Sequence, residues 1–353
     1  MNRRPAPGRR LVHFYVHGRG RGHAPHAEAI IRGLVDHGYE VTVFGGADVA
    51  PLFEPMAERF VQVTPVPHRP SPRAAKIFVL RLAQAVRATW EGRPDFLISD
   101  GDHPGVIAGR LWGCPVIAVG HGLVFSRCRR PSPLPWVPWI REAVKAGASS
   151  WPATDYVPVN FVPLEAPERP DTVLARPILD DAIRRLRALS EPHPGRRVLS
   201  YFRDGNARDV LPTLKRVLQP NDQIILFSPS PDEDKNLEVD VRPLDRTAFL
   251  DLLRRVDLVV ASSGSQLITE CIALQRPLFA LFDRDDDEQR LNVGMLQAVG
   301  AGDGCSYDQL SGPRLSRFVE DPPKGTAELW TWAAPDAAEA VLELLDRHQC
   351  KAS

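Results

Sequence analysis

A short turn of small residues between a predicted strand and a predicted helix carries the clearest chemistry in the chain. The apolar run 258–261 is short enough for a buried strand, and Leu267, Cys271 and Leu274 recur beyond it at helical spacing. Ser263-Gly264-Ser265 therefore lies at a helix N-terminus. Unpaired backbone N–H groups and the positive end of the helix dipole favour a phosphate there, with the serine hydroxyls as further donors. The alternative is a plain N-cap.

A carboxylate and a polar loop accompany this turn. Glu270 follows on the same predicted helix, where it could accept hydrogen bonds from a pair of sugar hydroxyls. The next predicted strand, 278–282, leads into the acidic loop 283–289 and then into Asn292. Together these features predict a pocket for a nucleotide sugar.

A second glycine-rich loop opens the chain's first predicted β–α–β unit. The strand-like run 13–17 leads into Gly18-Arg19-Gly20-Arg21-Gly22-His23, before a helix and the strand 40–44. The spacing is G-x-G-x-G rather than G-x-G-x-x-G, and glycines rather than an acidic residue end the second strand. The dinucleotide signal is therefore weak, and the loop is expected to let a substrate approach the backbone closely.

These motifs occur in an order that resembles a nucleotide-sugar glycosyltransferase of the GT-B fold. The resemblance spans about residues 11–302 and includes Gly22-His23, the strands 94–100 and 113–117, Ser263-Gly264 with Glu270, and Glu288-Gln289-x-x-Asn292. In particular, the sequence resembles the bacterial branch related to the peptidoglycan N-acetylglucosaminyltransferase and to plant and macrolide glycosyltransferases. The ordered set is more specific than any single motif.

The resemblance implies a role for each matching residue. Donor-side roles fall on Glu270 for the ribose, on 263–266 for the diphosphate, and on Glu288-Gln289, with Asn292, for the sugar. His23 matches a catalytic base, which Asp100 or Asp102 would orient. The acceptor side is expected to include Gly20, Arg21, Gly22 and His121. The whole set is Ser263, Gly264, Ser265, Gln266, Glu270, Glu288, Gln289, Asn292, His23, Asp100, Asp102, Gly20, Arg21, Gly22 and His121.

The sequence departs from the plant relatives at three points. Ser262 stands where they carry a histidine, and Gln266-Leu267 replaces their Asn-Ser pair. Their base-stacking tryptophan corresponds to the region of Val241. The nucleobase therefore stays open among uracil, thymine and guanine, with a UDP-sugar as the expected donor.

The reaction implied is inverting transfer of a sugar to a hydroxyl or amine of a small-molecule or lipid-linked acceptor. His23 would remove the acceptor proton, and the departing diphosphate would meet the helix N-terminus, so that neither a metal nor another cofactor is required. A nucleotide-sugar hydrolase or epimerase on the same fold is the main alternative. A non-catalytic nucleotide-sugar sensor is the third.

The composition argues against nucleic-acid-binding, disulfide-bonded, zinc-binding and transmembrane proteins. The 353 residues contain 44 basic and 44 acidic side chains, which leaves no electrostatic footprint for nucleic acid. The five cysteines are scattered without C-x-x-C spacing, which favours a reducing cytoplasm over disulfides or zinc. No run approaches the about 18 apolar residues that a transmembrane helix needs. We expect a cytoplasmic protein.

The length and the alternation of elements predict an α/β protein with two Rossmann-like parallel-sheet domains that face a cleft. Residues 1–185 form the expected acceptor domain, and residues 186–353 the expected donor domain. The Pro- and Gly-containing segment 191–195 marks the boundary. The final helix, 335–348, is expected to pack back on the first domain.

Two further segments allow competing interpretations. Residues 127–139 combine three arginines, two tryptophans and four prolines. An ordered surface loop that covers the sheet edge is favoured there over contact with lipid headgroups, and an acceptor lid is also open. His17, His23 and His26 with Asp100, Asp102 and His103 could form a metal site. The resemblance implies a metal-independent reaction, so no metal site is expected.

Overall fold

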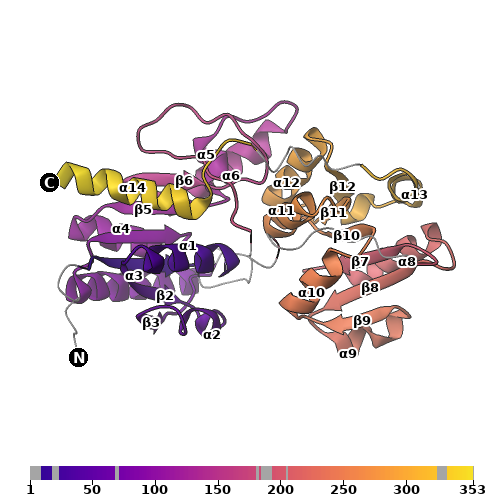
Figure 1. The fold of residues 1–353 in the computed structure, drawn as a ribbon, viewed down its shortest axis with the longest axis horizontal. Helices are drawn as coiled ribbons and strands as arrows, with labels where there is room; N and C mark the ends of the chain where they lie inside the picture. Colours follow the sequence, from indigo (N-terminus) through magenta and orange to yellow (C-terminus); the bar gives the residue numbers. More distant parts are fainter. Residues whose placement is uncertain are drawn as a thin grey trace.

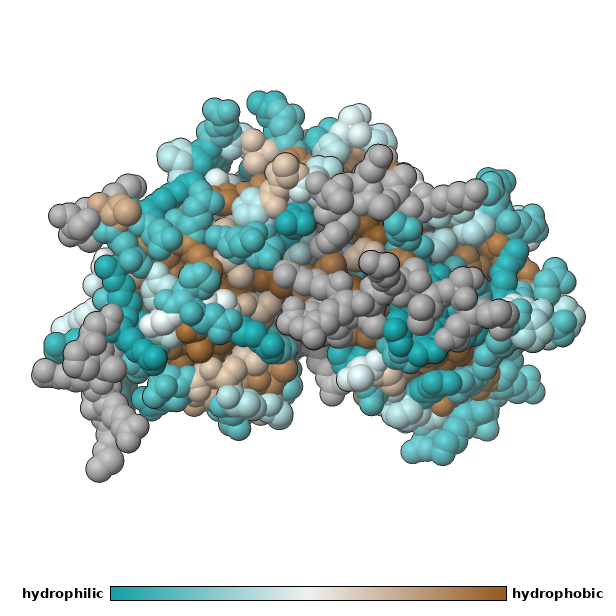
Figure 2. All heavy atoms as spheres, viewed as in Figure 1, coloured by the Kyte–Doolittle hydropathy of each residue, from teal (hydrophilic) through white to brown (hydrophobic). Residues whose placement is uncertain are grey.

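The computed structural model describes residues 9–17, 24–67, 71–179, 183, 193–203, 206–323 and 332–352. Two lobes follow one another along the chain, each built on a six-stranded parallel sheet with helices on both faces (Figure 1). Viewed as spheres, the lobes are separated by a notch at the lower edge of the molecule (Figure 2). This two-sheet arrangement is the one that the alternating strand and helix patterns predict.

The first sheet has the strand order β3-β2-β1-β4-β5-β6. Its strands are β1 (Leu11–Val16), β2 (Glu40–Gly45), β3 (Arg59–Gln62), β4 (Phe96–Asp100), β5 (Val116–Gly120) and β6 (Asp155–Pro158). Its helices are α1 (Ala24–Asp36), α2 (Ala50–Phe53), α3 (Pro72–Gly92), α4 (His103–Trp112), α5 (Leu123–Arg127) and α6 (Trp136–Ser150).

Side-chain alternation along the strands divides the core of this lobe between two faces. Phe14 and Ile98 pack under α1 on one face, together with Leu344 from the last helix, α14 (Ala337–Ala352). Figure 1 shows α14, in yellow, beside the indigo α1. Tyr15 and Leu97 point to the other face, where they pack under α3 and α4. The C-terminal helix thus completes the core of the first lobe.

The second sheet has the order β12-β11-β10-β7-β8-β9. Its strands are β7 (Arg197–Tyr201), β8 (Gln223–Ser228), β9 (Asp240–Pro243), β10 (Leu258–Ser262), β11 (Leu278–Phe282) and β12 (Gly302–Ser306). Its helices are α8 (Ala207–Val217), α9 (Pro231–Asp234), α10 (Arg246–Leu253), α11 (Ser265–Ala273), α12 (Asp287–Ala298) and α13 (Gly312–Glu320), with short 3₁₀ turns η1 (Lys235–Leu237) and η2 (Tyr307–Gln309).

A continuous apolar cluster joins the two lobes. Phe125 and Trp139 of the first lobe belong to the same buried cluster as Ile268 and Leu291 of the second. The Phe125 and Trp139 rings meet edge to face with centroids 5.1 Å apart. Helix α6 contacts α12 directly at this junction. The lobes are therefore fixed to each other by packing as well as by the chain.

Most expected elements lie within a few residues of the observed ones, and residues 127–139 show the main difference. The expected surface loop is only partly present, since α5 ends at Arg127 and α6 begins at Trp136. Trp139 is buried, whereas Trp136 is 62 % exposed. The expected boundary at residues 185 and 186 lies outside the described residues. No described helix is both long and apolar enough to cross a membrane.

Candidate functional site

The strand–turn–helix predicted around Ser263 is present at the carboxyl end of the second sheet. Strand β10 ends at Ser262, Gly264 is the N-cap residue, and α11 begins at Ser265. No side chain caps this helix, and a Cβ on Gly264 would meet open space. The first-turn N–H groups of α11 therefore face an accessible position, which is the local geometry that binds phosphate in α/β proteins.

The Ser263 hydroxyl points into the protein rather than toward that open position. It donates to Gln289 Oε1 at 3.0 Å, and Ser263 is fully buried. Of the two serines expected to supply phosphate donors, Ser263 therefore has its hydroxyl bonded inside the protein, whereas Ser265 is half-buried in the first turn. Buried hydroxyl groups are almost always hydrogen-bonded, and here Gln289 supplies the acceptor.

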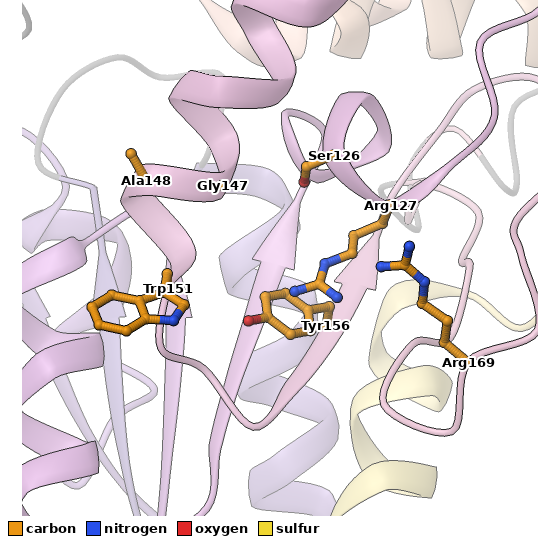
Figure 3. A pocket seen from close by; sticks show the side chains of 7 residues that line it. All are labelled: Ser126, Arg127, Gly147, Ala148, Trp151, Tyr156 and Arg169. Carbon is orange, nitrogen blue, oxygen red and sulfur yellow. The ribbon is translucent and has the colours of Figure 1, made fainter.

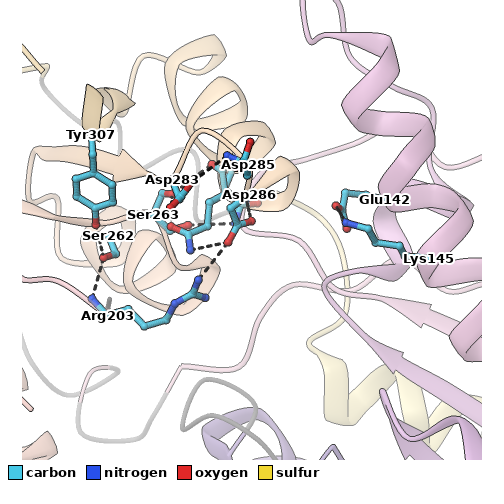
Figure 4. A network of polar contacts seen from close by, with 11 residues as sticks. Glu142, Lys145, Arg203, Ser262, Ser263, Asp283, Asp285, Asp286 and Tyr307 are labelled. Carbon is cyan, nitrogen blue, oxygen red and sulfur yellow. Dashed lines mark hydrogen bonds and ion pairs between the residues drawn. The ribbon is translucent and has the colours of Figure 1, made fainter. Parts of the chain in front are cut away.

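Arg203 lies beside this turn and was not predicted. Its backbone N–H donates to Ser262 Oγ at 3.0 Å, and Ser262 Oγ lies 2.9 Å from the Tyr307 hydroxyl. Its guanidinium donates to Asp286 Oδ2 at 3.1 Å, so Arg203 links β10 to the start of α12 (Figure 4). Arg203 lies two residues after the end of β7 at Tyr201, and ligands of parallel sheets bind at the carboxyl ends of the strands.

Glu270 is buried within α11 and already holds strong partners. Arg246 Nη1 donates to Glu270 Oε2 at 3.0 Å, and Arg246 Nη2 and Gln266 Nε2 both donate to Oε1. A carboxylate offers about four acceptor positions, so three of them are used here. With Glu270 only 1 % exposed, a ribose could reach it only after Arg246 moves. The side chain of Arg246 is 40 % exposed, which leaves space for that movement.

The N-terminus of α12 places the expected sugar-side residues next to the turn. Asp286 caps the helix by accepting from the Gln289 backbone N–H at 3.0 Å. The Gln289 amide nitrogen donates to Asp286 Oδ2 at 2.9 Å, and its oxygen accepts from Ser263. Glu288 is half-buried in the same turn. Gln289 therefore links the turn to α12, while the charge of Glu288 acts on Glu142 of α6 in the first lobe.

Asn292 joins the donor turn to the first lobe. Its Nδ2 donates to the Ser263 carbonyl at 3.2 Å, and its Oδ1 lies 2.7 Å from His121 Nε2. His121 follows β5, and its Nδ1 lies 3.1 Å from the Val159 carbonyl. The ring stacks on Phe161 with centroids 5.6 Å apart. The structure thus brings His121, expected on the acceptor side, into direct contact with a donor-side residue.

Asp100 and Asp102 occupy different environments at the end of β4. Asp102 caps α4 by accepting from the Gly105 N–H at 2.8 Å, and its other oxygen accepts from Arg81 at 2.8 Å. Both carboxylate oxygens therefore have structural partners. Asp100 is buried at the strand end, where its carbonyl accepts from the His17 N–H at 2.8 Å. Of the two, Asp100 is the one placed beside the end of β1.

The expected base and its loop fall outside the described residues. Gly20, Arg21, Gly22 and His23 lie in the interval 18–23, between β1 and α1. The described ends of this interval lie at the carboxyl edge of the first sheet, since β1 pairs in parallel with β4 as far as Asp100. The assignment of His23 therefore stays a prediction.

A group of charges lies where α6 faces the start of α12. Arg141 of α6 reaches Asp287 at 3.5 Å, and Lys145 pairs with Glu142 (Figure 4). Burial raises the pKa of Glu142, the Lys145 ammonium counteracts that rise, and the carboxylates of Glu288 and Asp287 add to it. The hydrogen bond to Glu142 raises the pKa of Lys145. Two cations and three carboxylates therefore meet at this junction, close to the expected sugar position.

Comparison of the sequence with known protein families gives a match. A family model described as glycosyl transferase family 1 matches residues 78–323, which is more than half of the chain. That interval includes the turn at Ser263, Glu270, and the start of α12. Among curated proteins, none matches the sequence.

Solved GT-B glycosyltransferases share the fold over nearly the full chain. MurG of Acinetobacter baumannii is 16% identical with a TM-score of 0.65, and covers 96% of this chain and 99% of its own. The glycosyltransferase VinC, solved with dTDP, is 17% identical with a TM-score of 0.62, covering 96% and 98%. A UDP-N-acetylglucosamine 2-epimerase is 15% identical with a TM-score of 0.64, covering 97% and 98%. At these identities the likeness concerns the fold.

Proposed function

Because this chain belongs to glycosyl transferase family 1, we propose that it transfers a sugar from a nucleoside-diphosphate sugar to a hydroxyl or amine of a small-molecule or lipid-linked acceptor. The observation that carries the proposal is the open N-terminus of α11, flanked by two guanidinium groups of the same lobe. The Arg203 guanidinium binds Asp286 at the start of α12, and the Arg246 guanidinium binds Glu270 on α11 itself. A diphosphate carries the negative charge and the oxygen acceptors that this position favours.

The donor's ribose is the proposed partner of Glu270. Binding would exchange one of the two Arg246 hydrogen bonds for a ribose hydroxyl and leave Arg246 close to the diphosphate. The Glu270 carboxylate is suited to this role, because a hydrogen bond to a charged group contributes about 1.5–3 kcal/mol. A uridine nucleotide is the expected donor base, and the dTDP bound to VinC supports thymidine as the second candidate.

The proposed chemistry is inverting and requires no metal. His23 removes the acceptor proton as the acceptor attacks the anomeric carbon from the face opposite the diphosphate. Asp100 is the proposed group that orients the His23 ring, because both oxygens of Asp102 are committed to Gly105 and Arg81. The α11 dipole and the flanking arginines meet the charge that develops on the leaving diphosphate.

Donor binding is tested by titrating UDP and dTDP into the protein in a calorimeter. Glu270→Gln should weaken the binding of the preferred nucleotide by about 1.5–3 kcal/mol. Glu238→Gln serves as the matched control, since Glu238 lies in the same lobe and its side chain is 88% exposed. Unchanged affinity in a Glu270→Gln protein with a normal melting temperature would remove Glu270 from the donor site.

Transfer is tested with a panel of UDP- and dTDP-sugars and of hydroxyl and amine acceptors. The product should carry the anomeric configuration opposite to that of the donor. His23→Ala should lower kcat by about 10²–10⁴-fold, the contribution of a general base, while donor affinity changes little. A stable His23→Ala protein that retains the wild-type turnover would refute the assignment.

The likeness to a UDP-N-acetylglucosamine 2-epimerase favours one alternative, an epimerase or hydrolase that acts on the nucleotide sugar alone. Such an enzyme would convert the donor at the same rate with and without any acceptor. A transferase would show conversion that rises with acceptor concentration. Tight donor binding with no conversion under either condition would instead indicate a sensor.

A further inference from the structure

Exposed large apolar side chains are concentrated on one side of the first lobe. Eleven of them are exposed among the described residues, and nine lie on α3, α4 or α6, or directly after α6. Three exceed 65 % exposure, namely Trp90, Leu111 and Trp151. The full set of nine is Val79, Leu80, Trp90, Leu111, Trp136, Val137, Ile140, Val144 and Trp151. Contiguous apolar surface of this kind marks an interaction site in a folded protein.

Contacts between the helices make this one surface, here called the α3–α4–α6 face. The rings of Phe78 on α3 and His103 on α4 lie 5.6 Å apart. His103 Nε2 lies 2.9 Å from the carbonyl of Trp151, which directly follows α6. The Trp90 and Trp112 rings join α3 to α4 at the other end. The face lies opposite the α1 and α14 side of the sheet.

Helix α6 shows the pattern most clearly because it is apolar on both sides. Trp139 and Ala146 are buried against the protein. Trp136, Ile140 and Val144 recur every four residues on the outer side, so they form a stripe along the exposed surface. A helix that only covered a core would carry polar residues at these positions.

The face also carries an excess of positive charge. The exposed charged residues of α3, α4 and α6 are six basic and one acidic, namely Arg73, Lys76, Arg87, Arg110, Arg141, Lys145 and Glu91. The whole chain has 44 of each sign, so this excess is local. Among the described residues, Arg73, Lys76 and Arg110 have no ion-pair partner. Two copies of this face would repel each other, whereas an anionic surface would be attracted.

A hollow of about 520 Å³ adjoins the α6 stripe at Trp151. Its floor is Tyr156 on the edge strand β6, and the Arg127 guanidinium lies over that ring, 3.1 Å from its centroid (Figure 3). Arg127 also contacts Asp171 at 3.3 Å. The Arg169 side chain lies on the same side as Arg127 in Figure 3. Two guanidinium groups beside an exposed indole are suited to a phosphate at a lipid–water boundary.

We propose that the α3–α4–α6 face docks on the surface of an anionic phospholipid bilayer. Trp90, Trp136 and Trp151 would lie at the headgroup level, the basic side chains would contact lipid phosphates, and the hollow at Arg127 and Arg169 would hold one of them. The inference concerns a surface of the first lobe and is independent of which sugar the second lobe binds.

The test is flotation of the purified full chain with vesicles of phosphatidylcholine, alone or mixed with phosphatidylglycerol. The wild-type protein should float with the mixed vesicles, float less with phosphatidylcholine alone, and be released by salt. Trp136→Ser/Trp151→Ser should lower vesicle affinity by at least about tenfold, since each removes a large apolar side chain from the interface. Arg169→Ala should lower affinity for the mixed vesicles only.

Val35→Ser is the matched control, because Val35 is an exposed large apolar residue of α1 that lies off the face. The control should float like the wild-type protein. All variants should keep the wild-type melting temperature and nucleotide affinity, so that failure here is separable from failure of the donor site. Three results would overturn the proposal: no flotation of the wild-type protein, equal loss in the control, or release from vesicles by soluble glycerol phosphate. A dimer in light scattering that the Trp136→Ser/Trp151→Ser change dissociates would assign the face to a second copy instead.

Discussion

The hydrogen bond between His121 and Asn292 links the two lobes, and removing it should lower the free energy of unfolding. Asn292→Ala deletes two hydrogen bonds at once, one to His121 in the first lobe and one to the Ser263 carbonyl beneath the donor turn. Asn292 is 1% exposed, so water cannot readily replace the lost amide. The substitution thus perturbs the lobe junction without touching the first turn of α11.

The expected size follows from those two bonds. Each neutral hydrogen bond contributes about 0.5–1.5 kcal/mol net, so their loss should destabilise the protein by about 1–3 kcal/mol. His121→Phe keeps an aromatic ring next to Phe161 but removes the bond to Asn292. Combined in a double-mutant cycle, the two changes should show a coupling free energy of about 0.5–1.5 kcal/mol.

Urea denaturation of the four proteins measures the coupling, with the loss of tryptophan fluorescence as the signal. Arg290→Ala is the control on the same helix, since Arg290 is exposed, and it should change the free energy of unfolding by less than about 0.5 kcal/mol. A coupling free energy near zero would mean that His121 and Asn292 do not bond in solution. That result would refute a hydrogen bond between the lobes at this position.

Three further predictions concern stability and thiol chemistry. Asp102→Ala should destabilise the protein by about 3–5 kcal/mol, because it leaves the Arg81 guanidinium buried without its partner and removes the cap of α4. Burial, with a smaller effect of Arg59, lowers the pKa of His13 from 6.5 to about 3. Between these values only the unfolded chain binds the proton, so stability should fall as pH drops, by up to about 1.4 kcal/mol per pH unit. Cys350 is exposed while the other four cysteines are buried, so a thiol reagent should label Cys350 rapidly and the others only on unfolding.

Each of these has a matched variant. Asp102→Asn keeps an acceptor for the α4 cap and should lose less stability than Asp102→Ala; equal losses would contradict the role of the cap. His13→Leu should flatten the dependence of stability on pH between about 3 and 6.5, and an unchanged slope would place the acid sensitivity elsewhere. Cys350→Ser should abolish the rapid labelling, and persistent labelling would show that a buried thiol is reached.

Local patterns in the sequence were enough to predict the architecture and the position of the donor turn. The strand 278–282 has the bounds expected from its apolar run, and α11 begins directly after Gly264. Short apolar runs and small residues before a helix are properties of neighbouring residues, so a single sequence contains them. The family match over residues 78–323 includes the donor turn, Glu270 and the start of α12, but not the glycine-rich loop at 18–23.

Only the tertiary structure decided what the polar side chains bind. Glu270 was expected to face a ribose, yet it is held by Arg246, which is 24 residues distant in the chain and lies on another helix. His121 meets Asn292 across 171 residues. Such partners depend on which faces of remote elements meet after the sheet has formed, and no local periodicity encodes that.

The surface of α6 also shows what the sequence predicts and what only packing decides. The sequence placed two tryptophans in one unusual segment, and both were interpreted as cover for a sheet edge. The structure buries Trp139 and leaves Trp136, the first residue of α6, 62 % exposed. Residue types in the sequence supplied the chemistry of the lipid-facing proposal, and packing of the helix alone determined which of them reach the surface.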